Sequence, residues 1–419
     1  MRLIRTTGSS PQAKSTIALR IRRWARLAPS KTKALASRQV EDMISRPRIL
    51  FFWEKFAPYH MDRCEACAIH FRDRYEVRGI EIASHSDFYQ WDPTGPGENF
   101  IKSTLFPGAS NSQLSQCRYF ISLLRACVSS RAEYIFLCGF QFPPIFLVAL
   151  CLRSLGRRII IMQDSKFDDK PRRLVKECLK ALLYMPYHAA LVGSPRSAQY
   201  LEFLGFLSSR IFLGYDVASM DRVVRLAACE PAPGGATHAQ RHITIIARFV
   251  PEKNLSVALA AYAVYRRQHR GTRDLHLCGS GPLEDALKDQ VARLGIEGVQ
   301  FRGYLQEEGI AKTLALSLAL ILPSVEEPFG LVVNEALALG VPVIVSENCG
   351  ARDLLVRSGV NGYVFEPDNV QGLARLMLLL DRDAKLWARL ASNSRAFRGV
   401  ADTEFFAASV DRIIDALSP

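Results

Sequence analysis

The sequence predicts an α/β protein built from two doubly wound domains that face a central cleft, and three observations support this fold class. The chain has 419 residues, more than one hydrophobic core usually serves. Hydrophobic residues make up 49% and charged residues 23%, as in ordered globular proteins. Short apolar runs alternate with helical segments on both sides of a linker rich in Pro, Gly and Ala, residues 229–241. Such sheets bind ligands at the carboxyl ends of their strands, so we expect the site in the cleft.

The first domain is expected over residues 47–228, where each apolar run has the length of a buried strand. Helical segments between the runs imply right-handed crossovers between parallel strands. The expected strands are 48–53, 75–83, 132–140, 157–164 and 188–194, and the expected helices are 57–74, 143–156 and one from Pro195.

One apolar run, residues 135–152, carries no charge and is long enough on paper to cross a bilayer. Gly139, Gln141, Pro143 and Pro144 interrupt it, where a spanning helix needs continuous backbone hydrogen bonds. We therefore expect a strand, a loop and a buried helix here, with membrane burial as the alternative.

The second domain is expected over residues 242–402, with the same alternation of strands and amphipathic helices. A last helix, 403–419, is expected to pack back on the first domain. The expected strands are 242–249, 274–281, 299–304, 318–324, 341–346 and 362–367, and helices are expected from Leu255, Leu283, Gly309 and Phe329.

Most of the formal charge of +13 lies in a basic leader, residues 1–46, which holds eleven Lys or Arg against Glu41 and Asp42. Two interpretations stay open: a flexible leader, or a short basic helix that lies on an anionic membrane through Trp24 and neighbouring apolar residues. No apolar segment follows the first arginines, so no secretory signal is expected.

The ten cysteines are scattered, and only Cys64 and Cys67 form a C-x-x-C pair, within a predicted helix. A zinc site needs a second pair, so no metal is expected. A reduced, cytoplasmic protein is the simpler interpretation.

The stretch 324–346 places two glutamates, Glu327 and Glu335, within an apolar run. We expect a helix from Phe329 to Leu339, with Pro328 in its first turn and free backbone N–H groups that attract phosphate. The two carboxylates would lie about 12 Å apart, which is the reach of a nucleotide sugar. One would hold sugar hydroxyls and the other a ribose; the alternative is a pair of solvated glutamates.

Two loops at strand ends supply further candidates. Arg248 and Lys253 in "ARFVPEKN" are cations suited to a diphosphate, although an ordinary basic loop would look the same. Gly279 and Gly281 in "LCGSGPLED" permit a close approach of a ligand, but a G-x-G alone more often marks a tight turn.

In their order and spacing, "ARFVPEKN", "CGSGPLED", "FRGYL" and "PSVEEPFGLVVNEALALGVPVIVSENCGARDLL" resemble the donor domain of retaining family 4-type glycosyltransferases. The resemblance covers residues 242–370 and implies the GT-B fold, which has two Rossmann-like domains. It also implies a metal-independent, hexosyltransferase-like enzyme without a cofactor, which moves a sugar from a nucleotide-diphosphate donor to an acceptor hydroxyl with retention of configuration.

The resemblance also implies roles for individual residues. The donor diphosphate would be bound by Arg248 and Lys253, the sugar hydroxyls by Glu327 and the ribose by Glu335. The remaining donor contacts would come from Phe329, Gly330 and Leu331, from Gly279 and Gly281, and from Tyr304 and Leu305 near the base.

The first domain departs from the family. It has "WEKFAPYHMDR" where relatives carry a Gly-Gly pair, and "QDSKFDDKPRR" where many present a histidine. Asp164, Ser165 and Lys166 are candidates there, and His60 is either a site residue or a capping or surface histidine. The Asp353 position is often Glu in relatives. Asp381 and Asp383 imitate a metal-binding D-x-D, but we interpret them as a solvated helix end.

Two hypotheses of other classes stay open. One is a catalytically silent, membrane-associated scaffold that retains the fold, and the other is a nucleotide-sugar epimerase. A dehydrogenase is disfavoured because no strand is followed by G-x-G-x-x-G. The expected partners are a nucleotide sugar, an acceptor glycan, lipid or small molecule, and an anionic membrane at residues 1–46, but no nucleic acid. The sugar, the base and the acceptor are not readable from the sequence.

Overall fold

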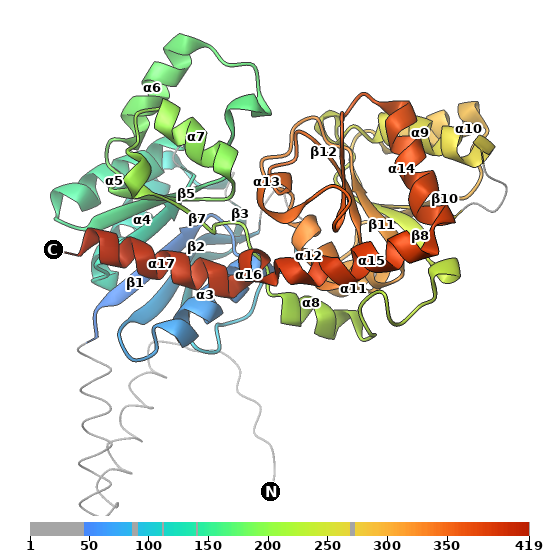
Figure 1. Cartoon of the computed structure of the whole chain (residues 1–419). Helices are drawn as coiled ribbons and strands as arrows, with labels where there is room; N and C mark the ends of the chain where they lie inside the picture. Colours follow the sequence, from blue (N-terminus) through green and yellow to red (C-terminus); the bar gives the residue numbers. More distant parts are fainter. Residues whose placement is uncertain (1–45, 86–90, 111–112, 140, 269–272, 419) are drawn as a thin grey trace, which may run out of the picture.

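A computed structural model describes residues 46–85, 91–110, 113–139, 141–268 and 273–418 (Figure 1). The basic leader lies outside these residues. Two parallel β-sheets with helices on both faces form the two halves of the molecule, as the alternation of strands and helices predicts.

The first sheet has seven parallel strands in the order β3-β2-β1-β4-β5-β6-β7. Its strand order reverses between β1 and β4, which is where doubly wound sheets bind ligands. The strands are β1 (Arg48–Trp53), β2 (Glu76–His85), β3 (Ile101–Ser110), β4 (Tyr134–Cys138), β5 (Arg158–Gln163), β6 (Ala189–Val192) and β7 (Ile211–Leu213), and the helices are α3 (Pro58–His70), α4 (Gln116–Ser130), α5 (Pro143–Ser154), α6 (Leu174–Tyr184) and α7 (Pro195–Phe203).

The second sheet has six parallel strands in the order β10-β9-β8-β11-β12-β13, with its switch point between β8 and β11. The strands are β8 (His242–Ile246), β9 (Leu275–Cys278), β10 (Val299–Gly303), β11 (Ser317–Leu322), β12 (Val343–Ser346) and β13 (Gly362–Phe365), and the helices are α8 (Met220–Ala227), α9 (Leu255–Gln268), α10 (Glu284–Leu294), α11 (Glu307–Ala315), α12 (Val332–Ala338), α13 (Arg352–Leu355), α14 (Val370–Arg382), α15 (Ala384–Ser394) and α16 (Arg398–Ala401).

The described residues of the uncharged run 135–152 form β4, a loop and α5, and six of their apolar side chains lie in the core of the first domain: Ile135, Leu137, Ile145, Val148, Ala149 and Leu152. In the described part of the chain, no helix is both long and apolar enough to span a membrane. Pro143 opens α5, where its missing N–H costs nothing. The expectation of strand, loop and buried helix is therefore confirmed.

The chain passes between the two halves twice, and the two passages lie side by side. The Ala218 backbone N–H donates to the Ala401 carbonyl at 3.3 Å, and the Met220 N–H donates to Asp402 at 3.3 Å. Between them, the Asn334 amide donates to the Ala401 carbonyl at 2.9 Å. These hydrogen bonds hold the two connecting segments together at the junction between the two halves.

The last helix, α17 (Thr403–Leu417), returns to the first half and packs along α3 (Figure 1). Phe406, Val410 and Ile413 join the buried cluster beneath the first sheet, together with Ile49 and Phe51 of β1. In contrast, α8 packs against α11 and α12 of the second half, although the sequence analysis assigned residues up to 228 to the first domain.

The segment 229–241 is bound to the second sheet rather than hanging free. Arg241 is 2% exposed, and its guanidinium donates to the carbonyls of Gly234, Ala236, Ala315 and Ser317. Four backbone acceptors satisfy this buried cation, and the segment is held by them.

Asp381 also differs from its sequence-based interpretation as part of a solvated helix end. It is 8% exposed, accepts a hydrogen bond from Tyr265 at 2.6 Å and pairs with Arg273 at 2.5 Å. Asp383 caps α15 by accepting from the Leu386 N–H at 2.8 Å. Both carboxylates therefore stabilise the second domain, and the interpretation as a solvated end was wrong for Asp381.

Candidate functional site at the domain junction

The centre of the candidate site is an ion pair between two loops that follow strands of the second sheet. Lys253 Nζ lies 2.6 Å from Glu327 Oε2, and Ser324 Oγ donates to the same oxygen at 2.9 Å. Glu327 is only 7% exposed. The backbone of Glu252 accepts from the Val325 N–H at 2.9 Å, which ties the two loops together and sets the pair.

The turn before α12 presents unpaired backbone donors beside this pair. Gly330 has φ +102°, and α12 begins at Val332, three residues later than expected, so Pro328 lies outside its first turn. Among the described residues, the backbone N–H groups of Gly330, Leu331 and Val332 have no acceptor, and all three residues are partly exposed. Free N–H groups at the start of a helix favour a negative charge.

The side chain of Phe329 points toward the first domain and not into the turn before α12. Its ring is 3% exposed and lies against Gly193, where an added Cβ would come within 3.2 Å of it. Its carbonyl accepts from the Ala351 N–H at 2.9 Å and from the Cys349 thiol at 3.0 Å. Phe329 thus fixes the turn through packing and its backbone acceptor.

Arg248 stands on the loop after β8 and is half exposed. Its nearest ion-pair contact is Glu252, at 3.9 Å, a loose approach between exposed groups. The structure does not bring its guanidinium to Glu327, although both belong to loops at the carboxyl end of the second sheet. Its assignment to the diphosphate stays a prediction.

Gly279 and Gly281 are needed by the loop that carries Arg248. A Cβ on Gly279 would lie 1.9 Å from the Ala247 carbonyl oxygen, and one on Gly281 would lie 2.6 Å from that of Phe249. The Phe249 N–H donates to the Ser280 carbonyl at 2.9 Å, so the two loops pack backbone to backbone. The close approach predicted at these glycines involves the protein's own chain.

Glu335 lies in a group of three carboxylates that share one arginine. Arg222 binds both oxygens of Asp62 at 2.9 Å and also pairs with Glu307. Burial raises the pKa of Glu335 to about 7, with Arg222 opposing and the charges of Glu307 and Asp62 adding to the rise. A carboxyl with a pKa of about 7 is protonated in about half of the molecules at neutral pH, and the protonated form donates as well as accepts a hydrogen bond.

Tyr304 and Leu305 follow β10, and an aromatic side chain of the first domain reaches them. The rings of Trp91 and Tyr304 meet edge to face with centroids 6.0 Å apart, and Leu305 is partly buried. Lys55 holds this segment by donating to the Trp91 carbonyl at 2.5 Å. Trp91 was not singled out from the sequence.

Lys166 is the first-domain candidate that touches the second domain. Its ammonium is 1% exposed, donates to the Glu327 backbone carbonyl at 2.8 Å and pairs with Asp169. Ser165 stays in its own loop, where its N–H donates to Gln163 at 2.9 Å.

Asp164, which is partly exposed, and the buried Asp216 form an acidic pair on the first-domain side. Burial raises the pKa of Asp164, with Asp169 adding to the rise, and burial together with the charge of Asp164 raises the pKa of Asp216. Arg63 opposes the second shift through a contact of 3.4 Å. Asp216 Oδ2 is buried without a hydrogen-bond partner among the described residues, which is unusual for a carboxylate.

His60 is a capping residue. Its Nδ1 accepts from the Ala57 N–H at 3.0 Å at the start of α3, and its ring stacks on Trp53 at 4.4 Å. Burial lowers the pKa of His60 well below its usual value, and the charge of Arg63 adds to this. Of the two interpretations left open by the sequence, the geometry matches the cap.

The sequence analysis missed an arginine on the first-domain side that spans the junction. Arg196, near the start of α7, contacts Asp353 at 2.9 Å and donates to the Cys349 and Glu347 carbonyls at 2.7 and 3.1 Å. It also pairs with Asp168 of its own domain at 2.5 Å. Its only signal in the sequence was its place directly after a strand, which is also the signal for Asp216.

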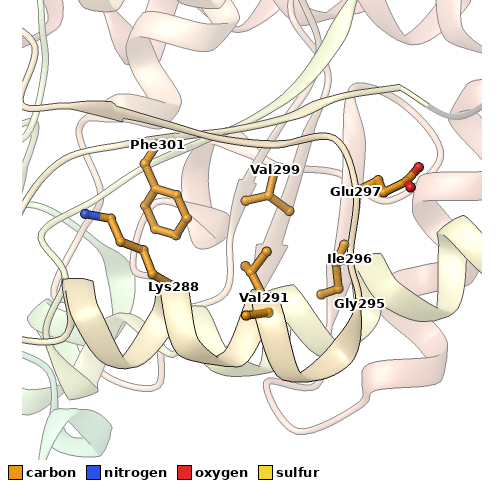
Figure 2. Close-up of a pocket in the computed structure, with 8 residues that line it drawn as sticks. Lys288, Val291, Gly295, Ile296, Glu297, Val299 and Phe301 are labelled. Carbon is orange, nitrogen blue, oxygen red and sulfur yellow. The ribbon is translucent and has the colours of Figure 1, made fainter.

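A separate hollow lies elsewhere, between α10 and the edge strand β10. Figure 2 shows Val291, Val299 and Phe301 inside it and Lys288 and Glu297 at its rim. Phe301 of the "FRGYL" motif lines it, but none of the residues with an implied donor contact does. We therefore place the candidate site at the domain junction.

Two facing parallel sheets, with these charged loops at their strand ends, define a GT-B protein. Sucrose-phosphate synthase from Thermosynechococcus elongatus shares the fold with a TM-score of 0.70 at 18% identity, over 89% of this chain and 99% of that chain. Anabaena HepE in complex with UDP gives a TM-score of 0.66 at 18% identity, over 88% and 100%. These likenesses show the fold alone.

Residues 231–397 match the family of glycosyl transferases group 1. Over 149 residues it is 36% identical to glycogen synthase from Mycobacterium tuberculosis, covering 35% of this chain and 34% of that protein. It is 30% identical to an uncharacterized glycosyltransferase from Methanocaldococcus jannaschii over 141 residues, 33% of this chain and 35% of that protein. The chain thus matches about a third of the length of these relatives, and the motif-based resemblance is confirmed.

Proposed function

We propose that the protein is a retaining glycosyltransferase that moves a sugar from a nucleoside-diphosphate sugar to an acceptor hydroxyl. The supporting observation is that the buried Glu327 carboxylate, held by Lys253 and Ser324, lies beside a turn with open N–H groups. A carboxylate suits sugar hydroxyls, and N–H donors with a nearby ammonium suit a diphosphate.

The catalytic term in this proposal is electrostatic. Negative charge grows on the leaving diphosphate as the glycosidic bond breaks, and fixed donors lower the energy of that state. Lys253 and the N–H groups of Gly330 and Leu331 are set before the reaction by the ties between their loops, and Arg248 on its exposed loop adds a further cation. The leaving phosphate takes the proton of the acceptor hydroxyl.

The nucleoside would occupy the other end of α12. Glu335, with its raised pKa, would hydrogen-bond the ribose hydroxyls, and Tyr304 and Leu305 would lie next to the base. The solved HepE complexes contain UDP and UDP-glucose, which supports a uridine nucleotide as the first donor to test. Trp91 would close the base side from the first domain.

We further propose a glycan or glycolipid acceptor held by the first domain. Similar proteins include an O-antigen chain mannosyltransferase from Escherichia coli and an amylovoran biosynthesis glycosyltransferase from Erwinia amylovora, whose names point to polysaccharide synthesis. Contact of residues 1–46 with an anionic membrane remains a proposal that lies outside the described residues.

The test is a panel of nucleotide sugars scored first by thermal stabilisation and then by product analysis. A donor that binds the native state should raise the melting temperature, and the same donor should be transferred or slowly hydrolysed with retention. A donor that stabilises the protein but is neither transferred to any acceptor tested nor hydrolysed would favour the silent scaffold. Conversion of the donor into an epimeric nucleotide sugar would favour the epimerase. Absence of any stabilisation would overturn the proposal.

A further inference from the structure

Helix α6 has its apolar side turned to solvent. Five of its apolar residues are more than half exposed: Leu174 at 71%, Val175 at 73%, Leu179 at 59%, Leu182 at 54% and Met185, at its C-terminal end, at 68%. With 100° between successive residues they fall within about 140° of the helix circumference. They therefore form one continuous outward face, which we call the α6 apolar face.

The inward side of α6 carries a charged network as well as the core residues Tyr184 and Leu183. Glu177 is 4% exposed, pairs with Lys180 at 3.1 Å and accepts a hydrogen bond from the Tyr200 hydroxyl. Arg172 lies over the Tyr200 ring at 4.5 Å. This buried network anchors α6 to α7, so the outward direction of the apolar face is set by the fold.

Positive charge accompanies the α6 apolar face on the same helix and on the segment before it. Over residues 170–185 there are five Lys or Arg and one acidic residue, and the acid is the buried Glu177. Lys170, Arg173 and Lys176 are exposed. Figure 1 places α6 at the outer end of the first domain, beside α7. Exposed apolar side chains together with exposed cations on a projecting helix match the interface of an anionic bilayer.

The charge also argues against two other occupants. Residues 1–46 carry a net charge of +9, so the leader would be repelled by the cations around the face. A second copy would bring the same cations against themselves. A surface rich in anionic lipid satisfies both the apolar residues and the charge.

We propose that the α6 apolar face docks the protein on a membrane that contains anionic lipids, with its leucines and valine entering the interfacial layer. The segment from Lys166 to α6 runs directly from the domain junction to this helix, so docking would hold the junction next to the bilayer. This inference does not depend on the donor, and its test needs no turnover.

The first test measures binding of the full chain to vesicles of phosphatidylcholine with and without phosphatidylglycerol. Leu179→Ser/Leu182→Ser should weaken binding to the anionic vesicles by about tenfold or more, because two inserted side chains are lost. Both residues are exposed, so the fold should be kept. The matched control is Leu294→Ser/Leu316→Ser in the second domain, at 38% and 46% exposure. Equal binding of both variants and the wild type would overturn the proposal.

The second test separates α6 from the leader. Cys178 is exposed on α6 and Cys229 is exposed in the linker. In the full chain with the other exposed cysteines changed to Ser, a polarity-sensitive dye on Cys178 should shift to the blue with anionic vesicles, and a dye on Cys229 should not. Binding without a shift at Cys178 would assign the membrane contact to another segment. Loss of a dimer on Leu179→Ser/Leu182→Ser, without vesicle binding by the wild type, would assign the face to a second copy. Either result overturns the proposal.

Discussion

The ammonium of Lys166 in the first domain donates to the backbone carbonyl of Glu327 in the second, at 2.8 Å. The same ammonium pairs with Asp169, and both side chains are buried. Position 327 is therefore contacted from both domains, through its carboxylate by Lys253 and through its backbone by Lys166.

Removing Lys166 should destabilise the protein more than removing the whole pair. In Lys166→Met, the buried Asp169 loses its partner, so we expect a loss of about 3 kcal/mol or more in the free energy of unfolding. Lys166→Met/Asp169→Asn should recover much of this loss, because the side-chain oxygen of Asn still accepts a hydrogen bond from the backbone N–H of position 166. Urea titrations of the wild type, both single variants and the double variant give the coupling. If the losses in unfolding free energy of the two single variants simply add up in the double variant, the charge of Asp169 does not depend on Lys166 for its stabilisation.

The proposed charge stabilisation predicts that Lys253→Ala and Arg248→Ala each lower the transfer rate about 10²-fold or more. Circular dichroism should show an unchanged fold. Lys288→Ala, which removes an exposed cation outside the junction, is the control. Near-normal rates in both site variants would remove these cations from the donor site.

Arg196 is expected to hold the domains in their closed arrangement. Arg196→Ala removes its contacts with Asp353 and with the Glu347 and Cys349 carbonyls. The KM for the donor should therefore rise about tenfold, which corresponds to a loss of about 1.4 kcal/mol in binding free energy. Small-angle scattering should show a larger radius of gyration without donor. Arg225→Ala, at an exposed arginine of α8, should change neither quantity. An unchanged radius would mean that other contacts suffice for closure.

The raised pKa of Glu335 predicts a pH dependence of stability. Because the folded protein holds this proton up to about pH 7 and the unfolded chain releases it near 4.5, stability should fall as pH rises between these values. Glu335→Gln does not titrate, so its advantage over the wild type should grow across that window and then level off. Melting temperatures from pH 4.5 to 8 measure it, and a constant difference would show that the carboxyl is not perturbed.

Gly279→Ala should be strongly destabilising, since φ is +145° and the new methyl group would meet the Ala247 carbonyl oxygen. Gly295→Ala is the matched control, with φ +58° and open space around the position. We expect about 1 kcal/mol for the control and distinctly more for Gly279→Ala. The rate of transfer should also fall in Gly279→Ala, because the displaced loop carries Arg248. Equal losses of stability in the two variants would mean that the loop shifts to accommodate the new methyl group at little cost.

The fold was predictable because buried parallel strands are apolar throughout, and helices between them follow a different period. β3 escaped prediction because it contains Pro107 and Gly108 and has no buried residue, and β7 because it has only three residues. The start of α12 was misplaced, since the positive φ of Gly330 inserts a turn after Pro328 that the sequence does not announce.

The site was predictable only within the second domain, where four motifs lie in fixed order. Contacts between the domains depend on how two separate sheets meet, so Arg196 and Asp353 could not be paired from their positions in the chain. Asp216 follows a strand too short to be recognised, which hid its relation to Asp164.

The return of α17 has a consequence for biosynthesis. Phe406, Val410 and Ile413 complete the apolar layer under β1, yet a ribosome makes them only after every strand of the second sheet. The half of the molecule that is translated first is thus finished last, and until then part of the apolar underside of β1 lacks its cover.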